Sequence, residues 1–353
     1  MNALDLAVKV PSPTTALGRR ALAWLRDPRD FVFLHVMLTC ALVAGLGVGM
    51  YFVPARWLPF VAPVYWLAWG LGALDRFMLM LHCTSHRPLF KPSALDRNLI
   101  IPWLIGPFFG QTPGTYFAHH MGMHHPENNL AGDLSSTMPY QRGKATHWLR
   151  YFGSFMAFGL YDLARYHQRR GNRRLFWKTL VGELSFVLLV VGLSFVAWRA
   201  TLVVFVIPFV VVRALMMAGN WGQHAFVDPT DAGNPFRNSI TCINTRYNRR
   251  CFNDGYHINH HQAPRAHFSE YPAEFAKNAE EYGRNDAIVF DGIDFFQVWL
   301  ALMFGRFGSL ADRFVQLPGA PKRDRAEVIE LLRSRVGGAQ VADLGLATEA
   351  SAE

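Results

Sequence analysis

Long apolar runs alternate with charged stretches along the first two thirds of the chain. Residues 31–53 contain no Asp, Glu, Lys or Arg, and residues 59–81 contain only Asp75 and Arg76. As helices with a rise of about 1.5 Å per residue, both runs are about 35 Å long, which is enough to cross a bilayer. The pattern therefore predicts a transmembrane helix over each run.

A third apolar region, residues 179–219, is too long for a single span. It contains only three charged residues. As one helix it would measure about 60 Å, which is about twice the hydrocarbon thickness of a bilayer. We expect it to fold back at residues 198–200, which gives spans at 179–198 and 201–219.

The remaining apolar segments are broken or short. Residues 99–117 contain three prolines and three glycines, so this stretch is expected to be interfacial or re-entrant rather than spanning. Residues 148–166 are amphipathic and can lie in the interface, while residues 295–304 are too short to cross. Residues 324–336 predict an amphipathic helix, and residues 337–353 have the composition of a disordered tail.

These elements predict an all-α membrane protein with four transmembrane helices in two hairpins and a cytosolic helical cap. The expected order is a cytosolic N-terminal segment (1–30), a membrane domain (31–317) and a C-terminal helix with its tail (318–353). Within the membrane domain, the cap comprises residues 82–178 and 220–317.

Charge sets the expected orientation. The net charge is +9, and basic residues concentrate before residue 31 and in residues 141–178. The positive-inside rule then places both termini and this loop in the cytosol. No zinc-finger or RNA-binding signature is present, so we expect no nucleic-acid partner and attribute the charge to the bilayer. The four cysteines form no Cys-x-x-Cys pair, which argues against a disulfide framework or a thiolate zinc site.

Three short stretches concentrate histidine at helical spacing. Their candidate ligands are His82 and His86, then His120, His124 and His125, then His257, His260 and His261. Residues three or four apart lie on one face of a helix, with Cβ atoms about 5–6 Å apart, so each stretch can contribute several rings to one site. In the predicted topology all three stretches lie on the cytosolic side. Imidazole is a ligand for iron, zinc, copper and nickel.

A fourth candidate lies where the last predicted span ends. His224 follows Asn220 by four residues and raises the number of candidate ligands to nine, which suits two metal ions better than one. Asn220 is a candidate to hold a metal-bound water. His119 and His267 are candidates for contacts that orient the ligands, with a purely structural role as the alternative.

The order and spacing of the three stretches resemble the three histidine boxes of the integral-membrane fatty acid desaturase superfamily, which also contains hydroxylases. The resemblance covers about residues 31–272 and includes the four-span topology. It implies a di-iron centre that uses O₂ and two external electrons to oxidise an unactivated C–H bond. It also implies nine ligands: His82, His86, His120, His124, His125, His224, His257, His260 and His261. Zinc can occupy the same ligands.

The resemblance also bears on partners. No His-Pro-Gly-Gly haem motif is present, so we expect a separate ferredoxin or cytochrome-type electron donor. The expected substrate is an acyl lipid, an acyl-CoA or an acyl-carrier conjugate. Its tunnel is expected between the spans, lined by Phe77, Met78, Met80, Met216 and Met217, although core packing accounts for these residues equally well.

Two charged residues lie within the predicted spans. Asp75 and Arg213 each precede a candidate site residue by seven positions, close to two helical turns. Charges at that depth are costly unless paired. We therefore expect Asp75 to pair with Arg213 or with Arg76.

The leading functional hypothesis is an O₂-dependent desaturase that introduces a double bond into a fatty acyl chain. Within the same chemistry, the alternative is a hydroxylase or ketolase acting on a lipid, an alkane or a carotenoid. A membrane metal transporter or metal-binding protein is a further alternative, but the histidines gather beyond the span ends rather than along a path. A zinc hydrolase normally has a carboxylate base beside its ligands, and no Glu lies within the three stretches.

Overall fold

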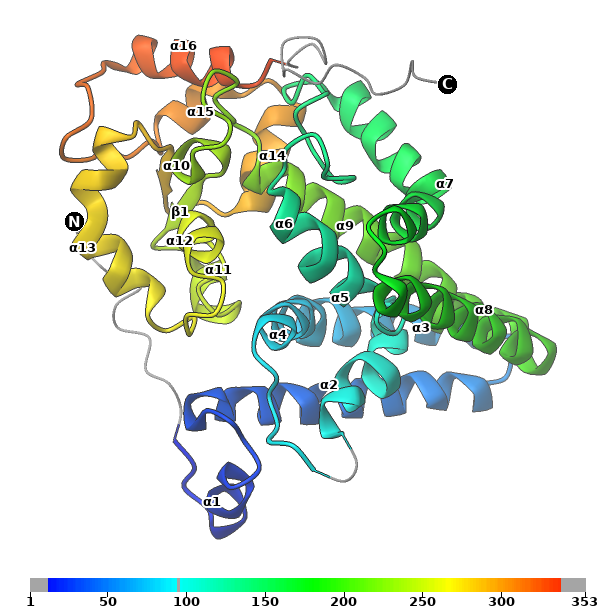
Figure 1. Cartoon of the computed structure of the whole chain (residues 1–353). Helices are drawn as coiled ribbons and strands as arrows, with labels where there is room; N and C mark the ends of the chain where they lie inside the picture. The colour runs from blue at the N-terminus through cyan, green and yellow to red at the C-terminus, as the bar shows by residue number, and fades with distance from the viewer. Residues whose placement is uncertain (1–11, 94–95, 338–353) are drawn as a thin grey trace.

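The computed structural model describes residues 12–93 and 96–337, and these residues are mostly helical (Figure 1). The α-helices are α1 (Ala16–Leu22), α2 (Phe31–Gly49), α3 (Leu58–Leu67), α4 (Asp75–His86), α5 (Thr115–His119), α6 (His125–Glu127), α7 (Ala145–Arg169), α8 (Arg173–Thr201), α9 (Ile207–Gln223), α10 (Pro235–Asn238), α11 (Arg246–Arg250), α12 (His257–Gln262), α13 (Tyr271–Arg284), α14 (Phe295–Met303), α15 (Phe307–Ala311) and α16 (Arg325–Arg335).

The remaining elements are short helical turns and two short strands. The 3₁₀ turns are η2 (Pro28–Asp30), η3 (Met50–Phe52), η5 (Arg97–Leu99) and η7 (Gly106–Phe109). The π-helical turns are η4 (Ala68–Leu74), η6 (Ile100–Ile105), η8 (His120–His124) and η9 (Leu202–Val206). Strands β1 (Thr241–Ile243) and β2 (Val289–Asp291) pair in parallel, with Thr241 opposite Val289.

Helix α2 has one buried face and one exposed apolar face. Its buried residues recur every three or four positions and include Phe33, Val36, Cys40 and Val43, which is the period of an α-helix. Leucines at 38, 42 and 46 on the other side are exposed. An exposed row of leucines suits a lipid environment better than water.

Helix α8 ends in a reversal of the chain. Ala197 has φ −157° and ψ 83°, outside the helical region, and beyond it η9 and α9 run back along α8. Residues far apart in sequence meet as a result: the rings of Phe186 and Phe209 stack with centroids 5.3 Å apart. The predicted fold-back is therefore confirmed. The observed break at Ala197 lies one residue before the predicted range of 198–200.

Two helical segments are long and apolar enough to cross a membrane, residues 28–52 and residues 173–223, counted over the part of the chain that the structure describes. The first corresponds to the predicted span 31–53. The second contains both arms of the α8–α9 hairpin. The continuous segment formed by α3, η4 and α4 over residues 58–86 is longer than the first of these, but it is not among the two. Four spans in two hairpins thus stay a prediction, as do the domain boundaries.

A second apolar core lies beyond the end of α9. Phe226, Ile240, Phe290, Val298 and Leu332 bring the chain after α9, the two strands, α14 and α16 together. Helix α16 begins with a capping box between Asp324 and Glu327, in agreement with the helix predicted over residues 324–336. The amphipathic stretch predicted over residues 148–166 lies within α7. The predicted disordered tail falls almost wholly on residues 338–353, outside the described residues.

Candidate metal centre

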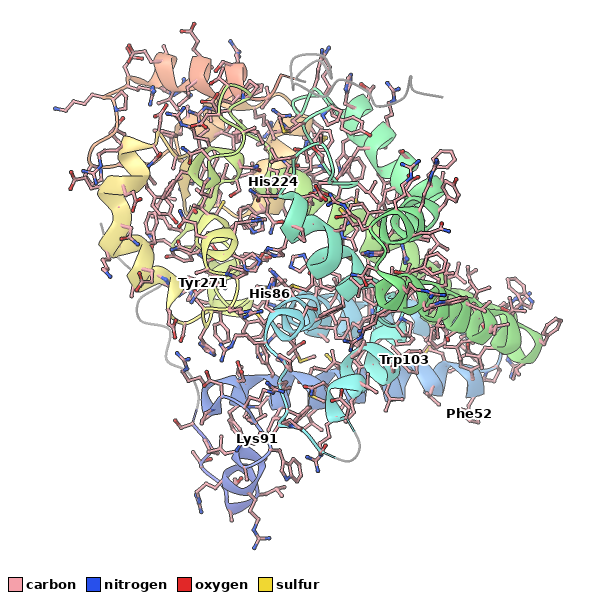
Figure 2. The ribbon with its side chains drawn as sticks, viewed as in Figure 1. Phe52, His86, Lys91, Trp103, His224 and Tyr271 are labelled. Carbon is pink, nitrogen blue, oxygen red and sulfur yellow. The ribbon has the colours of Figure 1, made fainter. Side chains whose placement is uncertain are left out.

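Five histidines from four elements converge at the end of α4. Their side-chain nitrogens lie within 4.8 Å of one another, and we call this set the five-histidine group: His82, His86, His120, His125 and His260. The Nε2 atoms of His82 and His260 are 2.9 Å apart, as are those of His86 and His120. His125 Nε2 lies 3.1 Å from His260 Nε2. Figure 2 shows His86 and His224 in the interior, between elements distant in sequence.

Four further histidines form a second set beside the first. This four-histidine group consists of His124, His224, His257 and His261, again within 4.8 Å of one another. His257 Nε2 lies 3.0 Å from His261 Nε2 and 3.4 Å from His224 Nε2. The structure therefore brings together all nine histidines that the sequence marked as candidate ligands.

The second histidine stretch divides between the two groups. His120 and His125, five residues apart, join the five-histidine group, whereas His124 joins the other. The cause is the π-helical turn η8 (His120–His124), in which the i→i+5 pattern replaces the α-helical phase. The assumption that His120 and His124 share one face is therefore wrong.

Burial keeps these rings neutral. Desolvation, followed by repulsion from neighbouring rings, lowers the pKa of His125 to about 2 and moves the pKa of His120, His257 and His260 well below the ordinary value. The pKa of His224 is lowered to about 4, mainly by burial. At neutral pH these imidazoles carry no proton charge and can offer a lone pair, as metal ligation requires.

The nitrogen spacing suits bound metal ions. With metal–nitrogen bonds of about 2.0–2.1 Å, adjacent ligands at tetrahedral or octahedral angles lie about 2.9–3.4 Å apart. The closest Nε2 pairs in the two groups lie 2.9 to 3.4 Å apart, and all ligand nitrogens of a group lie within 4.8 Å of one another. An all-imidazole donor set accommodates iron, zinc, copper or nickel, so the residues present fit a pair of such ions.

Several rings are held in orientation by polar groups that contact their Nδ1 atoms. His82 Nδ1 lies 3.2 Å from Asp254 Oδ1, and His124 Nδ1 lies 2.7 Å from Asp133 Oδ2. His224 Nδ1 donates to the carbonyl of Asn238 at 2.9 Å. The sequence pattern does not identify these partners. Asp254 stands three residues before the third stretch, but a single acidic residue at that spacing carries no recognisable signal.

The other predicted site residues take different positions. The amide nitrogen of Asn220 donates to the Ser135 carbonyl at 2.9 Å and to the Tyr151 hydroxyl at 2.7 Å. The ring of His119 stacks on that of His124 at 6.4 Å, and its buried Nε2 has no partner among the described atoms. Asn220 and His119 belong to neither group, so their indirect roles stay predictions.

His267 belongs instead to a network at the N-terminal end of α2. Its Nε2 lies 3.2 Å from Asp30 Oδ1, and its Nδ1 lies 2.7 Å from the Ser269 hydroxyl. Asp30 also lies 3.8 Å from Arg87, which follows the first histidine stretch. The contact therefore ties the N-terminal segment to the loop after α12, without touching either histidine group.

The predicted tunnel residues divide into two environments. Phe77 and Met80 are buried in the main core, where Phe77 stacks on Phe109. The amide of Gln111 donates to the sulfur of Met216 at 3.0 Å and also approaches Met78. Met217 belongs to a different cluster, with Tyr151 and Trp221. A tunnel lined by all five residues stays a prediction.

The predicted pairing of Asp75 with Arg213 or Arg76 is wrong. Asp75 forms an ion pair with Arg250 of α11. Its contact with Arg76 is a hydrogen bond from the Arg76 backbone N–H rather than an ion pair with the guanidinium. Arg213 lies 3.1 Å from Glu183 of α8. The reversal at Ala197 places Glu183 opposite Arg213, and the cap reaches Asp75, so each charge finds a nearer partner than the sequence argument considered.

Long exposed apolar helices that end at two groups of buried imidazoles define a helical membrane protein able to bind metal. The fatty acid desaturase family model matches residues 55–292, which is more than half of the chain and contains all nine histidines. The chain therefore belongs to the fatty acid desaturase family, and the resemblance drawn from the three histidine boxes is confirmed. Searches of curated proteins and of solved structures gave no match.

Proposed function

We propose that this membrane oxidoreductase introduces a double bond into a fatty acyl chain, using O₂, two iron ions and electrons from a separate donor. The observation that carries the proposal is the meeting of nine imidazoles in two adjacent groups, at the ends of apolar helices. Membership of the desaturase family supports it. We take the nine histidines as the iron ligands.

The overall reaction removes two hydrogens from adjacent carbons. One O₂, two electrons and two protons are consumed, and two water molecules are released. When bound, the iron pair supplies the oxidising power for breaking an unactivated C–H bond. The chain itself would hold the ions through imidazole rings, bury them away from bulk water and present exposed apolar helices to the acyl substrate.

The remaining parts of the proposal concern topology and partners. Four spans place both termini and the metal centre in the cytosol, where a ferredoxin or cytochrome-type donor has access. The acyl chain approaches from the bilayer, carried as a lipid, a CoA ester or an acyl-carrier conjugate. Basic residues of α7, such as Arg165 and Arg169, lie on the side that the positive-inside rule assigns to the cytosol.

The test is expression together with a working electron donor, followed by mass spectrometry of the total lipids. The expected product is lighter than its substrate by two hydrogens, and His260→Ala abolishes it. His35→Ala serves as the matched control, because His35 is exposed on α2 and belongs to neither histidine group. An unchanged lipid profile with an active donor refutes the proposal, and a product heavier by one oxygen identifies a hydroxylase instead.

A further inference from the structure

Asp133 is a buried carboxylate fixed against the four-histidine group. Its Oδ2 lies 2.7 Å from His124 Nδ1 and accepts the backbone N–H of Asn129 at 2.9 Å. Its Oδ1 accepts the backbone N–H and the hydroxyl of Ser135, at 2.8 and 2.6 Å. Among the described residues His124 is its one ion-pair partner. No arginine or lysine there neutralises this carboxylate.

Asp254 has the corresponding position at the five-histidine group. Its Oδ1 lies 3.2 Å from His82 Nδ1. Its Oδ2 accepts the Tyr247 hydroxyl at 2.7 Å and the Gln223 amide at 3.3 Å. These neutral donors hold the carboxylate in place without cancelling its charge. In the part of the chain that the structure describes, its ion-pair partner is again a ring of the metal centre.

The two contacts point to the same chemical role. Asp133 is hydrogen-bonded to the Nδ1 of His124, and Asp254 lies within ion-pair distance of the Nδ1 of His82, at 3.2 Å. A carboxylate held at Nδ1 favours the tautomer whose Nε2 carries the lone pair, and it makes that nitrogen a stronger ligand. Two divalent ions surrounded only by neutral rings would leave buried positive charge uncompensated. One buried carboxylate behind each group partly offsets this charge.

We propose that Asp133 and Asp254 are positioning residues, each of which controls one of the two metal ions through one histidine. The inference rests on the two-ion centre proposed above and adds which carboxylate serves which ion. Asp254 acts on the ion of the five-histidine group through His82. Asp133 acts on the ion of the four-histidine group through His124.

The experiment measures metal retention by the purified full-length protein. The iron-loaded wild type, Asp133→Asn and Asp254→Asn are dialysed against increasing chelator, and the iron per chain is determined at each step. Loss of an orienting carboxylate typically weakens metal binding 10–100-fold. Each variant is therefore expected to lose one ion at 10–100-fold lower free chelator, while the second ion dissociates as in the wild type. Mössbauer spectra should change for one iron site in each variant, and for different sites.

The chain offers a control for loss of a carboxylate away from the centre. Asp286→Asn removes a carboxylate that pairs with Arg323 and Arg335, outside both histidine groups, and should retain both ions as the wild type does. Asp133→Glu and Asp254→Glu keep the charge and should restore most of the retention. If either Asn variant fails to fold, the Mössbauer spectrum of its Glu counterpart, in which the carboxylate is displaced by one methylene, is compared with that of the wild type. A change confined to one iron site supports the inference, and a spectrum identical to that of the wild type overturns it.

The outcomes separate this inference from the proposed function. A wild type that binds no iron refutes the two-ion centre itself. A wild type that retains two ions, with both Asn variants within twofold of it, overturns only the role of the carboxylates. Equal loss from both sites in each variant also overturns it, because the assignment of one carboxylate to one ion requires unequal loss.

Discussion

Replacing Glu183 by Gln tests whether the buried ion pair fixes the reversal between α8 and α9. Glu183 Oε1 lies 3.1 Å from the Arg213 guanidinium and accepts the Thr112 hydroxyl at 2.5 Å. The side chains of Arg213 and Glu183 are only 15% and 11% exposed. The guanidinium also stacks over the Phe209 ring at 3.6 Å. The pair thus connects both arms of the hairpin to the loop that leads into α5.

The expected cost follows from the charge that remains. Removing one partner of a buried ion pair leaves the other charge uncompensated and destabilises by about 3–5 kcal/mol. Glu183→Gln should therefore lower the free energy of unfolding by an amount near this range. Arg213→Met in the Glu183→Gln background removes the stranded charge, so the double variant should be more stable than Glu183→Gln alone.

The assay is a double-mutant cycle of the free energy of unfolding, measured in one detergent at fixed pH. For residues in direct contact we expect an interaction term of about 0.5–3 kcal/mol. If the effects of Glu183→Gln and Arg213→Met simply add, or if Glu183→Gln costs less than about 1 kcal/mol, the ion pair does not hold the hairpin.

Three further predictions concern packing, metal and pH. A Cβ on Gly182 would lie 1.7 Å from the Pro113 carbonyl oxygen, whereas one on Gly192 meets nothing within 4 Å. Gly182→Ala should therefore lower the free energy of unfolding by about 1–3 kcal/mol or more, whereas Gly192→Ala should cause no measurable loss of stability in thermal unfolding. Equal losses for the two variants would contradict the close contact of Gly182 with Pro113. Removing metal by chelation should lower the unfolding temperature, and adding Fe²⁺ back should restore it, because a ligand that binds only the folded state stabilises it; an unchanged unfolding temperature argues against a bound ion. Burial lowers the pKa of His167, so below about pH 6.5 the unfolded state binds more protons than the folded state, and stability should fall on acidification from pH 7.5 to 5.5. The slope should be smaller in His167→Gln, and a rise in stability on acidification would refute this.

Local features of the fold were predictable because they depend on local pattern. The length of the apolar run and its absence of charge predict α2, and excess length alone requires a reversal in residues 179–219. The capping box at Asp324 marks the start of α16. The convergence of the histidines was also predictable, since imidazoles at helical spacing near the ends of apolar helices need a common partner.

Other features depend on information that a linear pattern does not contain. The π-helical turn η8 changes the phase between His120 and His124, and nothing in the composition of that stretch marks the change. Arg250 and Glu183 pair with charges distant from them in the sequence, and such partners are fixed only when the helices have packed. The carboxylates Asp133 and Asp254 lack a sequence signal for the same reason.

The division of the histidine stretches between the two groups constrains how the centre can change. The second stretch supplies His120 and His125 to one group and His124 to the other, and the third supplies His260 to one and His257 and His261 to the other. A deletion or replacement of either stretch therefore removes ligands from both groups, so neither stretch can be changed to alter one ion site alone. Deleting Gly122 would displace His124 and His125 relative to His120 and so disturb both groups at once, which means that neither site can be altered through this stretch alone.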